Sequence, residues 1–111
     1  MRDDSERLRD ILKAIDQILS KTSGDRSAFD RDEMLQVWTI HHLQIIGEAV
    51  RNLSLEFRQR HPDEVWAKAV GLRNILVHHY FEINVNRLRS IVTEDLPPLR
   101  DRIEMLLREV T

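Results

Sequence analysis

The chain has 111 residues, of which 41% are hydrophobic, so it is long enough for one domain with a single core. It contains no cysteine, which excludes a disulfide framework and a thiolate metal site. The formal net charge of −2 excludes a protein that binds polyanions through its overall charge, so any nucleic-acid site must be a local basic patch.

The sequence contains no apolar run near the roughly 20 residues that a membrane-spanning helix needs. The segment Met1–Asp4 is charged and lacks the apolar core of a signal peptide. We therefore expect a cytoplasmic protein that has no membrane partner.

Residues 4 to 21 are predicted to form the first helix, because apolar residues recur there with helical spacing. The cluster from Thr22 to Asp25 contains turn-forming residues and is expected to end this helix. The apolar stripe consists of Leu8, Ile11, Leu12, Ile15, Ile18 and Leu19.

A second helix is expected to begin at Ser27 or Asp30, each a possible N-cap, and to run to about Arg60. Its apolar residues cover more than one face, which indicates a helix in the centre of a bundle or at a subunit interface. One stripe consists of Leu35, Trp38, His42, Ile45, Ala49 and Leu53, and Val37, Ile40 and Ile46 widen it.

After a break at His61–Asp63, we expect a short turn at Glu64–Trp66 and then a third helix from Lys68 to Val77. Asn84 is a candidate cap for a fourth helix. This helix carries Val85, Leu88, Ile91 and Val92.

Pro97 and Pro98 are expected to break or restart the helix, because the residue before a proline resists the α conformation. In a last helix, Leu99, Ile103, Leu106 and Leu107 would face one way. The predicted fold is all-α: an antiparallel four- to five-helix bundle in which residues 1–111 form a single domain.

The stretch with the most chemical content lies between Arg73 and Tyr80. Its apolar centre separates Arg73 and Asn74 from His78, His79 and Tyr80. Arginine can hold a phosphate with two parallel hydrogen bonds, and histidine can move a proton near neutral pH. Together they suit cleavage of RNA through its 2′-hydroxyl, which needs a proton carrier and charge stabilisation but no metal.

Helical geometry separates the two principal residues of this stretch. At roughly 100° per residue, Tyr80 shares the face of Arg73, whereas His78 lies roughly 140° around the same helix. Either the helix ends before His78, or a second copy of the chain completes the site.

Two other interpretations compete with a catalytic site. An arginine and a histidine on one helix can simply be structural, since short motifs match by accident. The tandem pair His78-His79 could suggest metal binding, but adjacent helical residues point in different directions and no cysteine or suitably spaced acid supports zinc. We therefore expect no metal. His42 lies on an apolar stripe and is expected to be a satisfied core or interface residue.

The stretch from Gly71 to Phe81 resembles the signature of HepT-like toxins of the HEPN superfamily. In that signature an arginine is followed by four residues, a histidine, any residue and a tyrosine, the positions of Arg73, His78 and Tyr80. Arg73, Asn74 and His78 also fit the broader HEPN signature. The resemblance spans nearly the whole chain and includes Ile45–Ala49, Pro62–Trp66 and Asp95–Pro97.

The resemblance implies a HEPN-like fold and a metal-independent, cofactor-free endoribonuclease that cleaves mRNA or tRNA. Such proteins are homodimers with a composite cleft between two motif helices. They are the toxins of type VII toxin–antitoxin systems, and the partner is a minimal nucleotidyltransferase antitoxin of the MntA type. In the family this antitoxin adds AMP from ATP to the motif tyrosine, here Tyr80.

The resemblance also assigns roles to individual residues. Arg73 would bind the scissile phosphate and His78 would take or give the proton. Asn74 would orient the phosphate or His78. His79 stands where the family usually has glycine, and is expected to narrow the cleft or to act as a second proton carrier.

Charged residues outside the motif are further candidates for the site. Glu48 is expected to form a salt bridge to a basic group near the cleft, although a purely structural ion pair is an equal alternative. Arg51, Arg58 and Lys68 are candidate contacts for RNA phosphates, although charged helix faces are often only solvated.

The main alternative function is a binding module. It would be a HEPN-type dimer that no longer cleaves RNA and serves only as a partner of the nucleotidyltransferase. In a variant of this alternative, the domain is a nucleotide-binding accessory subunit of that enzyme. A purely structural dimerising bundle is the third interpretation, and the polar groups around the motif argue against it.

Overall fold

The computed structural model describes residues 3–24, 26–62, 64–79 and 84–110, and the side chains of all of these except 26, 64, 65, 75–79 and 110. The described residues form helices and connecting turns without a strand, so the protein has the all-α fold expected from its sequence. In this part of the chain no helix is both long and apolar enough to cross a membrane.

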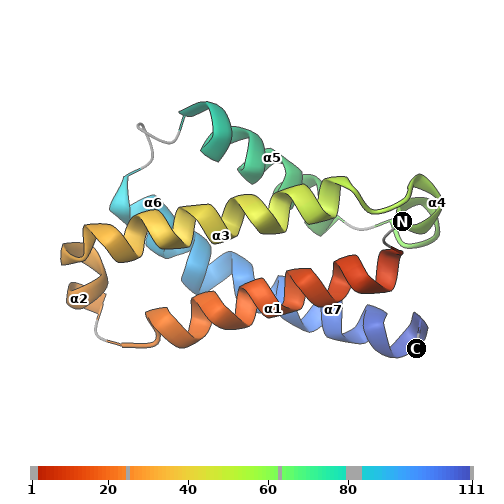
Figure 1. The fold of residues 1–111 in the computed structure, drawn as a ribbon, viewed down its shortest axis with the longest axis horizontal. Coiled ribbons are helices and arrows are strands. Elements are labelled where there is room, and N and C mark those ends of the chain that lie inside the picture. Colours follow the sequence, from red (N-terminus) through yellow and green to blue (C-terminus); the bar gives the residue numbers. More distant parts are fainter. Residues whose placement is uncertain (1–2, 25, 63, 80–83, 111) are drawn as a thin grey trace.

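Four long helical segments lie side by side and make the body of the bundle (Figure 1). Helix α5 (Glu64–His79) packs on α3 (Glu33–Arg51), α3 packs on α1 (Asp4–Thr22), and α1 packs on α7 (Leu96–Val110). Neighbours in this row run in opposite directions. The short helices α2 (Arg26–Arg31), α4 (Leu55–Arg60) and α6 (Val85–Ser90) connect them.

The core lies between α1, α3 and the C-terminal helices. The predicted apolar stripes of the first and last helices are buried in it, with Leu12, Leu19 and Leu107 packed partly buried at its edge. Fully buried side chains include Leu8, Ile11, Ile15, Ile18, Leu43, Leu88, Ile91, Leu96, Ile103 and Leu106.

The expected second helix is divided into three. Neither Ser27 nor Asp30 is the cap: α2 already begins at Arg26, and α3 is capped by Asp32, whose side chain accepts a hydrogen bond from the backbone of Leu35. A second interruption follows Arg51, and Ser54 caps α4 by accepting from the backbone of Phe57. Local side-chain caps of this kind compete with a continuous helix.

The third helix is longer at both ends than the sequence indicated. Helix α5 begins at Glu64, directly after the expected break, and continues through His79. The buried Trp66 donates from its indole nitrogen to the carbonyl oxygen of His61 at 2.8 Å. Tertiary packing of Trp66 thus brings the expected turn at Glu64–Trp66 into the helix.

Of the break or restart expected at Pro97 and Pro98, the structure shows a restart: the helical path is not broken, and α7 begins at Leu96, directly before Pro97. Helix α6, capped as expected by Asn84, continues through a π-helical turn, η2 (Ile91–Asp95), directly into α7. The backbone N–H of Leu96 bonds to the carbonyl of Ile91, one residue further back than in an α-helix. The wider turn accommodates prolines in the first turn of α7, where their missing N–H groups cost little.

Candidate functional site

Arg73 occupies the face of α5 that packs against α3. Trp66 and Ala69 precede it by seven and four residues, so they share its face of the helix, and both are buried. The side chain of Arg73 is half-buried at this helix–helix contact. The packing of α5 therefore decides where the guanidinium lies.

Glu48 is the residue of α3 that meets this arginine. Its Oε2 lies 3.1 Å from Nε of Arg73, so the salt bridge anticipated for Glu48 is formed with the motif arginine itself. Nη1 of Arg73 also donates to Oδ1 of Asn74 at 3.2 Å. Two of the candidate site residues, Asn74 and Glu48, are thus in direct contact with Arg73.

Gly47 allows the two helices to approach this closely. A Cβ atom at Gly47 would lie 2.1 Å from Cβ and 2.8 Å from Cγ of Arg73, and 3.1 Å from the carbonyl oxygen of Ala69. The first two distances are far below van der Waals contact. A glycine inside a helix costs about 1 kcal/mol relative to alanine, so a mid-helix glycine is itself a sequence signal of close packing.

Asn52 is a further neighbour that the sequence reasoning missed. Its Nδ2 donates to the backbone oxygen of Glu48 at 2.9 Å and to Oε1 of the same residue at 3.3 Å. It is the C-cap of α3. Its spacing of four residues from Glu48 was the available signal, because residues i and i+4 are neighbours on a helix.

The other basic candidates lie on three different helices. Lys68 lies on α5 five residues before Arg73, which places it roughly 140° around the helix. Arg51 is exposed at the end of α3, and Arg58 is half-buried on α4. Arg51 follows Glu48 by three residues and therefore shares its face of α3, whereas Arg58 belongs to another helix; all three remain candidate RNA contacts.

The remaining motif residues belong to the end of α5 and beyond. The backbone of His78 and His79 is helical, whereas their side chains lie outside the described ones. Tyr80 lies outside the described residues altogether. Because α5 continues through His79, the first of the two geometric alternatives, a helix that ends before His78, does not apply.

An exposed apolar stripe on α3 leads to the site. Met34, Val37 and Ile45 are 84%, 59% and 38% exposed. With His41 and Glu48, which are also exposed, they are spaced three or four residues apart and share one face of the helix. The buried residues of α3, among them Leu43, Ile46 and Val50, lie on the opposite face.

The stripe predicted for this helix was therefore not its core face. Leu35, Trp38 and Ala49 are only partly buried and Ile45 is exposed. His42 is half-buried and satisfied as expected: its Nδ1 lies 2.9 Å from the carbonyl oxygen of Trp38, and its ring lies 4.0 Å from the Trp38 ring. The expectation that this helix is central is correct, since α3 contacts α1, α2, α5 and α6.

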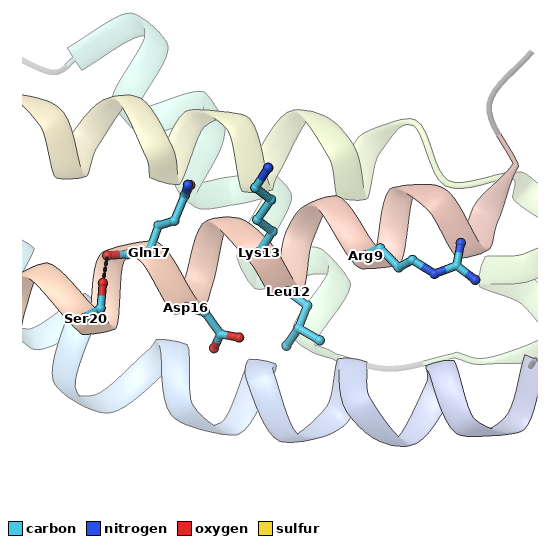
Figure 2. A pocket seen from close by; sticks show the side chains of 6 residues that line it. All are labelled: Arg9, Leu12, Lys13, Asp16, Gln17 and Ser20. Carbon is cyan, nitrogen blue, oxygen red and sulfur yellow. Dashed lines mark hydrogen bonds between the residues drawn. The ribbon is translucent and has the colours of Figure 1, made fainter.

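Two surface hollows are lined by described residues, and neither includes a residue of the motif. A hollow of about 490 Å³ runs along α1 between Arg9 and Ser20 (Figure 2). A second, of about 250 Å³, lies beside Phe29 and Arg89.

The family model described as "Ribonuclease HepT-like" matches residues 11–106. The chain belongs to this ribonuclease family. The motif and the Arg73–Glu48 contact lie within the matched region, as do α3 and α5 in full.

Two of the curated relatives match this chain over nearly their whole length. The protein "Putative RNase MJ1380" of Methanocaldococcus jannaschii is 38% identical over 106 residues, which cover 95% of this chain and 97% of that protein. "Probable ribonuclease HepT" of Thermococcus cleftensis is 35% identical, covering 95% of this chain and 96% of that protein. The comparison with solved structures gave no match.

Proposed function

We propose that this HepT-like protein is a metal-independent endoribonuclease and the toxin of a toxin–antitoxin pair. The observation that carries the proposal is the placement of Arg73: it is held at the α3–α5 contact by Glu48 and Asn74, on a helix that continues through His78. An oriented guanidinium that acts together with a proton carrier suits transesterification of an RNA phosphate.

The reaction needs no group beyond those of the chain and the RNA. The ribose 2′-oxygen attacks the adjacent phosphorus, its proton passes to a base, and the bond from phosphorus to the 5′-oxygen breaks. The leaving 5′-oxygen takes a proton from an acid, and the products are a 2′,3′-cyclic phosphate and a 5′-hydroxyl. In the proposal His78 moves the protons, and Arg73 stabilises the charge that develops on the phosphate.

We further propose that the working unit is a C2 homodimer. Arg73 and His78 lie roughly 140° apart on a helix that extends past both, so one copy does not converge them. The exposed apolar stripe of α3 ends at Glu48, next to Arg73, and α5 packs mainly on α3. Burying this stripe against a second copy would bring two motif helices together around one symmetry axis.

The proposed regulation is AMPylation of Tyr80 by a minimal nucleotidyltransferase antitoxin of the MntA type. In a helical register Tyr80 shares the face of Arg73, seven residues away. An added AMP would place negative charge where the RNA phosphate must bind, and it could pair with Arg73 itself.

The proposal is tested by cleavage of a cellular RNA pool in excess EDTA by the wild type, Arg73→Ala and His78→Ala. We expect the wild type to cleave RNA, to leave DNA intact and to produce 2′,3′-cyclic phosphate ends. Each variant should lose a factor of roughly 10² to 10⁴, typical of a general acid or base or of a charge-stabilising group. Circular dichroism serves as the control for folding. Folded variants that cleave as fast as the wild type would contradict the proposal and leave the binding module in its place.

A further inference from the structure

The guanidinium of Arg73 is held from one side. Glu48 contacts it at Nε, and Asn74 accepts from Nη1. We propose that Glu48 is a positioning residue for Arg73, and that Gly47 leaves the space that Cβ and Cγ of the arginine occupy. This inference rests on the proposed ribonuclease function and names the residues that orient its phosphate-binding group.

The nitrogen of Arg73 that Glu48 contacts determines whether this carboxylate orients the guanidinium or competes with the RNA phosphate for it. A guanidinium has five N–H donors, and Nε carries one of them. Glu48 contacts the guanidinium at Nε, which leaves Nη2 and one hydrogen of Nη1 outside the contacts with Glu48 and Asn74. The Nη edge is the one that can present two parallel donors to a phosphate.

Glu48 is itself anchored. Asn52 donates from Nδ2 to Oε1 of Glu48, the oxygen that does not contact Arg73, and to the backbone oxygen of the same residue. The carboxylate thus has one oxygen for each neighbour. The chain from Asn52 through Glu48 to Arg73 joins the end of α3 to the motif helix.

Gly47 determines where Cβ and Cγ of Arg73 lie, whereas Glu48 determines how its guanidinium is oriented. Any Cβ at Gly47 would overlap Cβ and Cγ of Arg73, and the backbone of α5 fixes the position of the Arg73 Cβ. A side chain at Gly47 must therefore push α5 away from α3, and this moves Arg73 with it.

A positioning carboxylate has a kinetic signature that a structural ion pair lacks. Its negative charge weakens the binding of RNA phosphate, while its hold on Nε aligns the guanidinium for the transition state. Removing the charge should therefore lower both KM and kcat, because ground-state repulsion and alignment disappear together. A contact that only stabilises the fold would change neither parameter in the folded enzyme.

The test compares Glu48→Gln, Gly47→Ala and the control Asp16→Asn in the full-length protein. Asp16 of α1 pairs with Nε of Arg100 on α7 at 2.6 Å, and its carboxylate is 47% exposed against 48% for Glu48. Figure 2 shows Asp16 pointing from α1 toward α7, away from the side on which α3 lies. The control is thus the same kind of interhelical ion pair, without a link to the motif.

For Glu48→Gln we expect kcat to fall about tenfold and KM to fall severalfold on one defined RNA substrate. For Gly47→Ala we expect kcat to fall by up to about 10²-fold, the effect of a displacement near 1 Å at a reacting group. Asp16→Asn should keep both parameters, and thermal melts should show which variants are folded.

A folded Glu48→Gln enzyme with wild-type kcat would overturn the inference, as would an equal effect of Asp16→Asn. If Gly47→Ala does not fold, the result for Glu48→Gln decides alone. The variant Arg73→Ala distinguishes a failure of the proposed ribonuclease function from a failure of the positioning role of Glu48. If Arg73→Ala remains active, the proposed function fails. If it is inactive while Glu48→Gln equals the wild type, only the positioning role fails.

Discussion

Asp4, at the start of α1, accepts two hydrogen bonds from Ser54, which lies 50 residues later in the chain: one from the backbone nitrogen at 2.8 Å and one from Oγ at 2.6 Å. The Ser54 hydroxyl also caps α4 by accepting from the backbone nitrogen of Phe57 at 3.0 Å. One side chain therefore joins the end of α3 to the start of α1 and begins the next helix. Glu48 and Asn52 lie just before this junction.

Replacing Ser54 by alanine should destabilise the protein. The variant loses the cap of α4 and one bond to Asp4, and loss of a serine cap typically costs about 1 kcal/mol. We expect the free energy of unfolding in urea to fall by roughly that amount. Ser20→Ala is the control, because the Ser20 hydroxyl donates to the carbonyl oxygen of Gln17 within its own helix, and its effect should be smaller. Equal stability of the two variants would show that the junction contributes nothing.

The exposed stripe of α3 is predicted to be the dimer interface. A charge at Val37 would be buried in that interface without a partner, so Val37→Glu should yield a monomer. Met105→Glu is the matched control on α7, where the side chain is 49% exposed. Sedimentation equilibrium should give about twice 13.2 kDa for the wild type and the control, and 13.2 kDa for Val37→Glu. A monomeric wild type would count against the composite site.

Mixing two inactive variants tests whether the copies share a site. If one site takes Arg73 from one chain and His78 from the other, a dimer of Arg73→Ala with His78→Ala contains one intact site. Half of the dimers in an equimolar, re-equilibrated mixture are mixed, so about a quarter of the wild-type activity should return. The measurement is RNA cleavage before and after mixing. No recovery, with mixed dimers demonstrated by mass spectrometry, would refute this arrangement of the site.

Tyr80 is predicted to be the AMPylated residue. Incubation with the cognate nucleotidyltransferase and ATP should add AMP to a Tyr80 peptide and abolish RNA cleavage, because the added phosphate repels the RNA phosphate near Arg73. Peptide mass spectrometry and the cleavage assay measure the two effects. Tyr80→Phe should stay unmodified and active under the same conditions. Inhibition of Tyr80→Phe without added AMP would mean that complex formation alone suffices.

Much of the fold could be predicted because helices follow from local spacing. The apolar repeats of the first and last helices correspond to buried faces of α1 and α7, and Asn84 caps α6 as expected. The errors of the sequence-based prediction concern where one helix ends and the next begins. Asp32 and Ser54 interrupt a segment whose apolar pattern runs on, whereas a π-turn carries the chain through Pro97. Pattern reasoning averages over several residues, and a single cap or turn does not alter the average.

The sequence by itself determined the helical class and the motif from Arg73 to Tyr80, and it left two ways in which Arg73 and His78 could meet: a helix that ends before His78, or a second copy of the chain. Those conclusions depend on residue type and helical periodicity, which are local properties. Only the tertiary structure decided that α5 runs on through His79, that Glu48 and not another acid holds Arg73, and that Gly47 lies beneath it. These facts depend on how α3 and α5 cross, and that crossing is set by packing between residues far apart in the chain.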